Sequence, residues 1–226
     1  MTRTSSTIAA SIILLAVLAF FFSSHHTQAG TSTLPAPALD DSLAATSSQQ
    51  TIVLAGGCFW GIQAVFEHVK GVTSATAGYA GGTAQTADYE TVSSGDTGHA
   101  ESVKVVYDPS KITLGQLLRV FFSVAHDPTE LDRQGPDYGK QYRSAIFYTT
   151  ENQKKIAQAY INQLTQAKVF TSPIVTQINP NSAFYAAEDY HQDYATKHPD
   201  NPYIMINDAP KVDHLRQQFP DLYKAQ

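Results

Sequence analysis

The chain has 226 residues, of which 42% are hydrophobic, enough for the core of one good-sized domain. Its formal net charge of -5 at pH 7 and its lack of a Lys/Arg block make nucleic acid and anionic membrane surfaces poor partners. A single cysteine excludes a disulfide framework and any cysteine-rich zinc site.

The N-terminus has the pattern of an export signal. Arg3 precedes an apolar run at residues 8–22, and Thr27-Gln28-Ala29 offers a small-residue cleavage site before Gly30. The run is about 15 residues long, and roughly 20 are needed to span a bilayer. We therefore predict a signal peptide at residues 1–29, with an uncleaved signal anchor through residues 8–22 as the alternative. The expected location is exported, periplasmic or secreted, or membrane-anchored and facing outward.

Residues 30–50 are rich in Ser, Thr, Ala and Pro and contain no aromatic residue. This composition predicts a flexible linker, because such a segment has little apolar surface to bury. The folded domain is accordingly expected at residues 51–226.

The first predicted strand, residues 51–55, leads into a helix whose apolar residues Phe59, Ile62 and Phe66 recur at helical spacing. Cys58 then lies in the first turn of that helix. Unpaired N–H groups and the helix dipole favour the thiolate there, and we expect them to lower a thiol pKa near ~8.5 by a unit or more. Cys58 is therefore a candidate nucleophile; the alternative is a small buried hydrophobic side chain.

The next two predicted strands are residues 72–77 and 100–107. In the second of these, Glu101 points the same way as the apolar Val103 and Val105. A carboxyl on an apolar face is desolvated, which raises its pKa from ~4.3 and leaves part of it protonated near pH 7. Glu101 is a candidate general acid; alternatively it lies in water or pairs with Lys or Arg.

Helices and strands alternate through the rest of the chain. Capping boxes are predicted at Thr113 with Gln116 and at Thr150 with Gln153, the second opening a helix that runs to about Lys168. Further predictions are strands at 141–149 and 173–178 and a short helix in the tail after Phe184. This order indicates an α/β or α+β fold in which helices pack on a small mixed sheet.

Four runs resemble, in order, the signature runs of the type A family of peptide methionine sulfoxide reductases. They are GCFWG at 57–61, GYAGG at 78–82, GDTGHAE at 95–101 and QYRSAI at 141–146, and the similarity extends over roughly residues 51–203. The resemblance implies a single compact domain with a two-layer sandwich core. It also implies reduction of the S epimer of methionine sulfoxide, free or in proteins, and hence protein repair.

The resemblance implies roles for seven side chains. Cys58 would attack the sulfoxide sulfur, and Glu101 would protonate the oxygen. The other five would line the site: Tyr89 and Tyr142 bonded to the oxygen, Phe59 and Trp60 around the S-methyl group, and Asp137 near the same pocket.

Each of these five has a structural alternative. The two tyrosines are common packing residues, and Phe59 and Trp60 would serve equally well as core anchors of the first helix. Asp137 would shape the Gly135-Pro136-Asp137 turn, where Pro136 departs from the polar residue frequent in the family.

Turnover would leave Cys58 as a sulfenic acid, and no second cysteine is present to resolve it. We therefore expect an external thiol reductant: thioredoxin, glutathione with glutaredoxin, or a partner in the exported compartment. We expect a monomer with no bound cofactor and no metal, since His99 and His191 lack ligand spacing.

Two other functions fit parts of this pattern. Cys58 with His99 as base would make a hydrolase or acyl transferase, although no orienting group accompanies them. A non-catalytic exported binding module would instead recognise methionine side chains in an aromatic pocket, with Cys58 merely buried.

Overall fold

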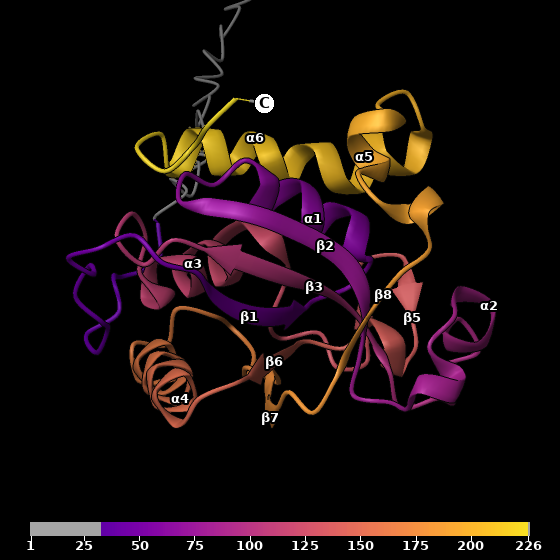
Figure 1. Cartoon of the computed structure of the whole chain (residues 1–226), viewed down its shortest axis with the longest axis horizontal. Helices are drawn as coiled ribbons and strands as arrows, with labels where there is room; N and C mark the ends of the chain where they lie inside the picture. The colour runs from indigo at the N-terminus through magenta and orange to yellow at the C-terminus, as the bar shows by residue number, and fades with distance from the viewer. Residues whose placement is uncertain (1–32, 226) are drawn as a thin grey trace, which may run out of the picture. The chain divides into compact units, whose positions relative to one another are not determined.

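A computed structural model describes residues 33–225 (Figure 1). Its main sheet has six strands in the order β7-β6-β1-β3-β2-β8, all neighbours antiparallel except β6 and β7. The strands are β1 (Gln50–Ala55), β2 (Val72–Ala80), β3 (Ala100–Tyr107), β6 (Ala145–Tyr148), β7 (Gln177–Pro180) and β8 (Phe184–Ala186). A separate hairpin joins β4 (Arg133–Gln134) to β5 (Asp137–Tyr138).

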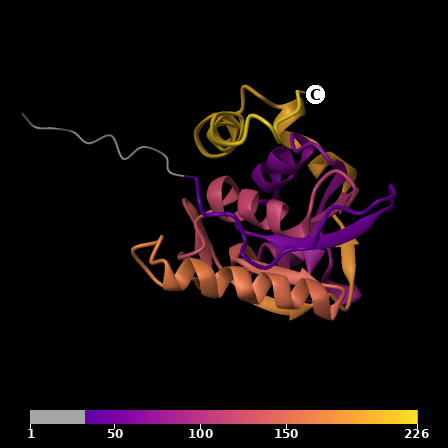
Figure 2. The ribbon, with the colours of Figure 1, turned by 90° about the vertical axis from the view of Figure 1, so that its left-hand side faces the viewer.

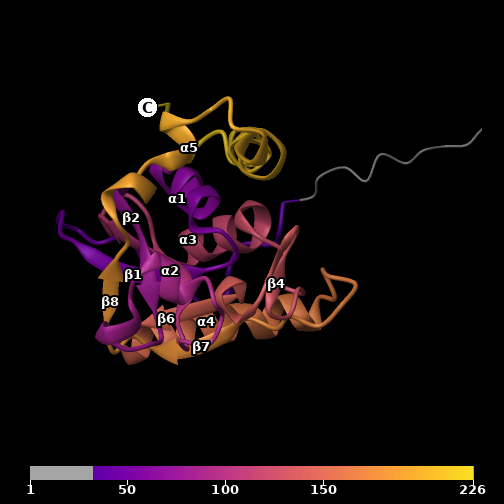
Figure 3. The same cartoon turned by 90° about the vertical axis from the view of Figure 1, so that its right-hand side faces the viewer.

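The main helices pack on one face of this sheet. Figures 2 and 3 show α6 end-on at one side of the domain and α4 at the other, with α1 and α3 between them and the strands alongside. The helices are α1 (Phe59–Glu67), α2 (Tyr89–Val92), α3 (Leu114–Val120), α4 (Glu151–Gln166), α5 (Tyr194–Lys197) and α6 (Ala209–Gln218). The 3-10 turns are η1 (Ala84–Thr86), η3 (Lys140–Tyr142) and η4 (Asp189–His191), and the π-helical segments are η2 (Phe121–Ala125) and η5 (Ile204–Asp208). The predicted α/β sandwich with a mixed sheet is confirmed.

Successive side chains of each strand point to opposite faces of the sheet, and this divides the core into two parts. Ile52 and Leu54 of β1 and Val103 of β3 belong to the main core, which also takes in the apolar stripes of α1, α3 and α4. Val53 of β1 and Phe147 of β6 point to the other face, where they join a smaller cluster. Glu101 shares the face of Val103, as the alternation predicts, and is 2% exposed.

The predicted capping boxes are realised to different extents. At α3, Thr113 accepts from the Gln116 backbone while the Gln116 side chain accepts from the Thr113 backbone. At α4, Thr150 accepts from the Gln153 backbone, but the Gln153 side chain accepts from the backbone of Thr149 instead.

Three predicted boundaries are wrong. The strand expected at 141–149 begins only at Ala145, because residues 140–142 form the η3 turn. The strand expected at 173–178 is β7, which starts at Gln177 and pairs with β6. The tail begins with the edge strand β8, since Phe184, Tyr185 and Ala186 pair with β2, and the predicted short helix is α5, which starts only at Tyr194.

The described part of the expected flexible linker lies along the domain instead. The Asp40 carboxylate accepts from the Gly115 backbone at 2.8 Å at the start of α3, and Tyr160 of α4 donates to the Pro35 carbonyl at 2.8 Å. The backbone of Ala38 donates to a side chain of α4 as well. Residues 33–48 form no helix or strand, yet polar groups order them, which composition alone does not reveal.

No helix within residues 33–225 is long and apolar enough to cross a membrane. The apolar run at 8–22 and the predicted signal peptide lie outside the described residues.

Candidate active site

A sharp turn between β1 and α1 places the cysteine. Gly57 has a φ of +94°, a region that favours glycine, and a Cβ there would lie 2.5 Å from the Gln134 side chain. The chain therefore reverses direction at Gly57 and enters α1 with Cys58 at its N-cap. Cys58 is 8% exposed, so its sulfur is nearly enclosed while lying at the positive end of the helix.

Glu101 reaches the same helix start from β3. The backbone N–H of Phe59 donates to its Oε2 at 3.1 Å. Burial raises the pKa of Glu101 to about 8, the negative charges of Asp137 and Asp208 add to this, and the Phe59 N–H opposes it. Glu101 is therefore mostly protonated near pH 7, and the bond to Oε2 leaves Oε1 to carry the proton.

The direction expected for the thiol pKa is wrong in this closed pocket. Burial raises the pKa of Cys58 well above its ordinary value, and the charges of Glu101 and Asp208 raise it further. The Trp60 N–H and Lys211 lower it, but less. The helix start does favour the thiolate, yet loss of water outweighs it because the sulfur is enclosed.

Cys58 and Glu101 line one pocket of about 210 Å³. The structure brings together in it all seven side chains that the sequence singles out. Its residues are Cys58, Phe59, Trp60, Tyr89, Glu101, Asp137, Tyr142 and Tyr203.

The eighth, Tyr203, is a residue that the sequence analysis missed. Its hydroxyl donates to Asp137 Oδ2, and burial raises its pKa, so the hydroxyl stays neutral. Tyr203 stands at the end of the region of resemblance, and no local pattern distinguishes it from the other eleven of the chain's 12 tyrosines. Asp137 is thus a hydrogen-bonded pocket residue rather than only a turn residue.

Packing fixes the orientation of Trp60. Its indole stacks on Tyr194 with ring centroids 3.9 Å apart and meets Tyr203 edge-on at 5.9 Å. The indole N–H donates to Nδ1 of His191 at 3.2 Å. Burial lowers the pKa of His191, which keeps it neutral with its proton on Nε2. His191 therefore fixes the indole of Trp60, and its ring also packs against Phe59 and Tyr89, with centroids 5.1 and 4.4 Å apart.

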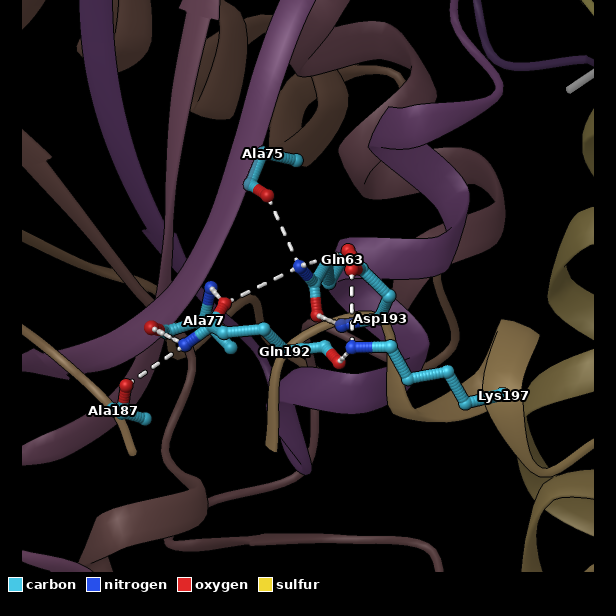
Figure 4. A network of polar contacts seen from close by, with 7 residues as sticks. All are labelled: Gln63, Ala75, Ala77, Ala187, Gln192, Asp193 and Lys197. Carbon is cyan, nitrogen blue, oxygen red and sulfur yellow. Dashed lines mark hydrogen bonds and ion pairs between the residues drawn. The ribbon is translucent and has the colours of Figure 1, made fainter. Parts of the chain in front are cut away.

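A polar network holds the segment that carries His191 against α1 and β2 (Figure 4). The Gln63 side chain donates to the Ala75 carbonyl at 3.0 Å and accepts from the Asp193 backbone at 3.0 Å. Gln192 accepts from the Ala77 backbone at 3.0 Å and donates to its carbonyl. These bonds satisfy backbone groups of β2 and of Asp193, and so tie the segment that follows η4 to α1 and β2.

The two pocket tyrosines are neutral hydrogen-bond donors. Burial raises the pKa of both Tyr89 and Tyr142, and the charge of Glu101 adds to this. The backbone of Tyr89 donates to Glu188 Oε1 at 2.9 Å, and Tyr79 donates to Oε2 of the same carboxylate at 2.9 Å. Glu188 thereby ties α2 to β2 and positions Tyr89.

His99 has other partners than Cys58. Its Nδ1 lies 3.2 Å from the Gly82 backbone nitrogen and its Nε2 lies 2.9 Å from the Thr83 carbonyl oxygen. Both ring nitrogens are thus engaged with the loop after β2, and His99 does not line the pocket. The Cys58–His99 pairing that a hydrolase needs is not formed. Within residues 33–225, no group of three or more His, Cys, Asp or Glu side chains is arranged to hold a metal.

The site therefore joins a nucleophile to a proton donor, in a space suited to a small apolar group. Such a site belongs to enzymes in which a thiol attacks an electrophilic atom while a carboxylic acid delivers a proton. Comparison with known proteins places the chain more narrowly. The sequence profile of the family described as "Peptide methionine sulfoxide reductase" matches residues 50–223, and the chain belongs to this family of oxidoreductases.

The relatives agree with this placement. The chain is 59% identical over 179 residues to "Peptide methionine sulfoxide reductase MsrA 2" of Mesorhizobium japonicum, which covers 79% of this chain and 92% of the relative. It is 51% identical over 195 residues to the protein of the same name from Synechocystis, covering 85% and 91%.

Solved structures show the same fold. The reduced form of Mxr1 from Saccharomyces cerevisiae has a TM-score of 0.61 and 34% identity, covering 71% of this chain and 94% of that one. Methionine sulfoxide reductase A of Corynebacterium diphtheriae has a TM-score of 0.58 and 36% identity, covering 69% and 77%. The family resemblance of the four sequence runs is thus confirmed.

Proposed function

We propose that the chain reduces the S epimer of methionine sulfoxide, free or in proteins, to methionine in a thiol-dependent reaction. One observation carries the proposal: the only cysteine shares a small, largely aromatic pocket with a buried, protonated carboxyl group. A sulfoxide oxygen is a weak base and a poor leaving group, so its removal needs a positioned proton.

The proposed step transfers one oxygen atom and two electrons. The Cys58 sulfur attacks the sulfoxide sulfur while the proton of Glu101 passes to the oxygen. The S–O bond of the sulfoxide breaks, and the new S–S bond is cleaved as the oxygen, carrying this proton, bonds to the Cys58 sulfur. Methionine thus leaves as a thioether and Cys58 becomes a sulfenic acid. The proton lost from the thiol restores Glu101, so atoms and charges balance.

The other pocket residues would bind and orient the substrate. The hydroxyls of Tyr89 and Tyr142 are neutral donors suited to the sulfoxide oxygen. Phe59 and Trp60 offer an apolar surface to the S-methyl group, and Asp137 is held by Tyr203 at the same pocket. An apolar surface on one side and oxygen-binding groups on the other would distinguish the S from the R epimer.

The reaction is tested by incubating the chain with each epimer of methionine sulfoxide and dithiothreitol. We expect methionine from the S epimer and no methionine from the Cys58→Ser variant. A non-catalytic binding module would bind the substrate and yield no product. Full activity of Cys58→Ser would overturn the proposal.

We also propose that an external thiol regenerates the enzyme. The sulfenic acid reacts with one thiol to form a mixed disulfide and water, and a second thiol then releases Cys58 and a disulfide. The reductant is thioredoxin-like, or glutathione with glutaredoxin. Steady-state rates with thioredoxin against glutaredoxin plus glutathione distinguish the two routes. If dithiothreitol supports turnover but thioredoxin and glutaredoxin with glutathione do not, neither of these two is the reductant.

For location, we propose export directed by residues 1–29. The supporting pattern is Arg3, the apolar run at 8–22 and the small residues before Gly30. N-terminal sequencing of the protein recovered from the exported fraction is the test. A start near Gly30 indicates a cleaved signal, retention of Met1 in the membrane fraction indicates an anchor, and recovery only from the cytoplasm contradicts export.

A further inference from the structure

A buried ion pair lies beneath the first turn of α1. Asp208, the last residue of η5, is 0% exposed, and its Oδ1 accepts from Nζ of Lys211 at 3.0 Å. Its Oδ2 is buried and has no hydrogen-bond partner within residues 33–225. A buried carboxylate oxygen without a partner is costly, so this arrangement needs an explanation other than stability.

Glycine allows the pair to approach the helix that carries Cys58. A Cβ on Gly61, three residues after Cys58, would lie 2.1 Å from Asp208 Oδ1 and 2.7 Å from Lys211 Nζ. The ion pair therefore touches the backbone of the first turn of α1, where α6 packs against α1 (Figure 1). The Asp208 carboxylate there is fully buried, and the Lys211 side chain is 18% exposed.

The charged and titratable groups around the thiol come from every element packed about it. His126, which follows η2, is neutral because burial lowers its pKa to about 3. The others are Glu101 on β3, Asp137 on β5, Asp208 on η5, Lys211 on α6, and the hydroxyls of Tyr89, Tyr142 and Tyr203. Three carboxyl groups thus face one ammonium group in this set.

The two charges of the pair act on the thiol in opposite directions, and the charge of Asp208 also acts on Glu101. The charge of Asp208 raises the pKa of both Glu101 and Cys58. Lys211 lowers the pKa of Cys58. The chemistry requires Glu101 to keep its proton while Cys58 loses one. Asp208 favours the first and Lys211 favours the second, and enzymes commonly separate two such groups through their surroundings.

We propose that Asp208 and Lys211 are positioning residues that distribute the proton between the reacting groups: Asp208 retains it on Glu101, and Lys211 stabilises the thiolate of Cys58. The inference rests on the proposed function in taking Cys58 as the nucleophile and Glu101 as the acid. Neither residue of the pair lines the pocket, so they act through charge rather than through contact with substrate.

The test measures the thiol pKa from the pH dependence of alkylation by iodoacetamide, in a Glu101→Gln background where residue 101 does not titrate. A charge nearby shifts a pKa by about one unit. We expect Lys211→Met to raise the thiol pKa by about one unit, Asp208→Asn to lower it by about one unit, and Lys211→Arg to leave it within about 0.3 unit. A purely structural role does not shift the pKa in opposite directions in the two variants.

Lys154→Met is the matched control. Lys154 forms an ion pair with Glu151 at the same i,i+3 spacing on α4, which lies by strands β6 and β7 rather than by α1. The Lys154→Met substitution should leave the thiol pKa unchanged. The inference is overturned if the thiol pKa is unchanged in Lys211→Met, or if it shifts in the same direction in Lys211→Met and Asp208→Asn. If Lys211→Met does not fold, the sign of the shift in Asp208→Asn decides alone.

A second readout uses the chain with Glu101 intact. Asp208→Asn should move the alkaline limb of the single-turnover rate to lower pH by about one unit, because Glu101 loses its proton earlier. An unmoved limb contradicts the role of Asp208. The proposed function fails separately, through activity retained in Cys58→Ser, whatever the alkylation shows.

Discussion

At the scale of single residues, Glu101 shows how one side chain serves chemistry at the expense of the fold. It is 2% exposed and lies among main-core side chains, where an ionised carboxylate is unfavourable. The fold therefore holds it as a neutral acid, which is the form that a proton donor needs.

Replacing Glu101 by Gln should slow the chemical step by about 10²-fold or more, because the amide still donates a hydrogen bond but has no acidic proton. In the unaltered chain, the rate should fall as pH rises above about 8, since Glu101 then ionises. Single-turnover rates across pH check both. An unchanged rate in the variant would mean that Glu101 is structural.

The same carboxyl should make stability depend on pH. Its pKa rises from 4.5 to about 8 on folding, so its contribution is fully present below pH 4.5 and is lost as pH increases through 8. Glu101→Gln removes this loss. We expect the difference in melting temperature, variant minus unaltered chain, to become larger as the pH increases from 5 to 9. A constant difference across this range would contradict a buried neutral acid.

Sequence was informative about Glu101 and misleading about Cys58 for one reason. Alternation along β3 shows that residue 101 faces the core, so its desolvation is predictable. The pKa of Cys58 is raised chiefly by burial, which folding creates, and it also depends on Glu101, Asp208 and Lys211, the last two of which are 150 or more residues away in the sequence. Tyr203 was missed for the same reason, because only folding brings it to Asp137.

At the scale of elements, α1 is confined on two sides, by β3 and by the start of α6. Gly61 lies on the α6 side, and its missing side chain is the space that Asp208 and Lys211 occupy. Local helix propensity and tertiary packing therefore oppose each other at this position.

Gly61→Ala tests this opposition. In an unobstructed helix the change stabilises by about 1 kcal/mol. Here the new Cβ would collide with Asp208 Oδ1, so we expect a net loss of roughly 1–3 kcal/mol, as overpacking produces. Urea unfolding measures it. Combining it with Asp208→Ala should recover part of the loss, and a stabilising single substitution would show that α6 moves away freely.

Elements with local signals were predictable and those without were not. The capping box at Thr113 and the apolar spacing of α1 depend on neighbours three or four residues apart. Strand β8 depends on pairing with β2, more than 100 residues earlier, and nothing near Phe184 indicates that partner.

At the scale of the whole molecule, residues 33–48 join the two helices α3 and α4 from outside. They supply acceptors to the Gly115 backbone and to the Tyr160 hydroxyl and bond to Arg119 at the end of α3. The segment therefore belongs to the folded domain, although its composition is that of a linker.

A chain beginning at Gln49 should be less stable than one beginning at Thr33. Several hydrogen bonds of about 0.5–1.5 kcal/mol each are lost, giving a decrease of roughly 2–4 kcal/mol in the free energy of unfolding. Urea denaturation of both forms measures this. Because the lost contacts lie on α3 and α4 rather than in the pocket, kcat at a temperature where both are folded should stay the same. Equal stability would mean that the contacts contribute nothing in solution.

Trp60 is the only tryptophan of the chain. Its indole forms one side of the pocket and is fixed between Tyr194, Tyr203 and His191. All tryptophan fluorescence of the protein therefore originates at the site of the chemistry, so its emission is an intrinsic optical signal that follows substrate arrival and the oxidation state of Cys58 without any label.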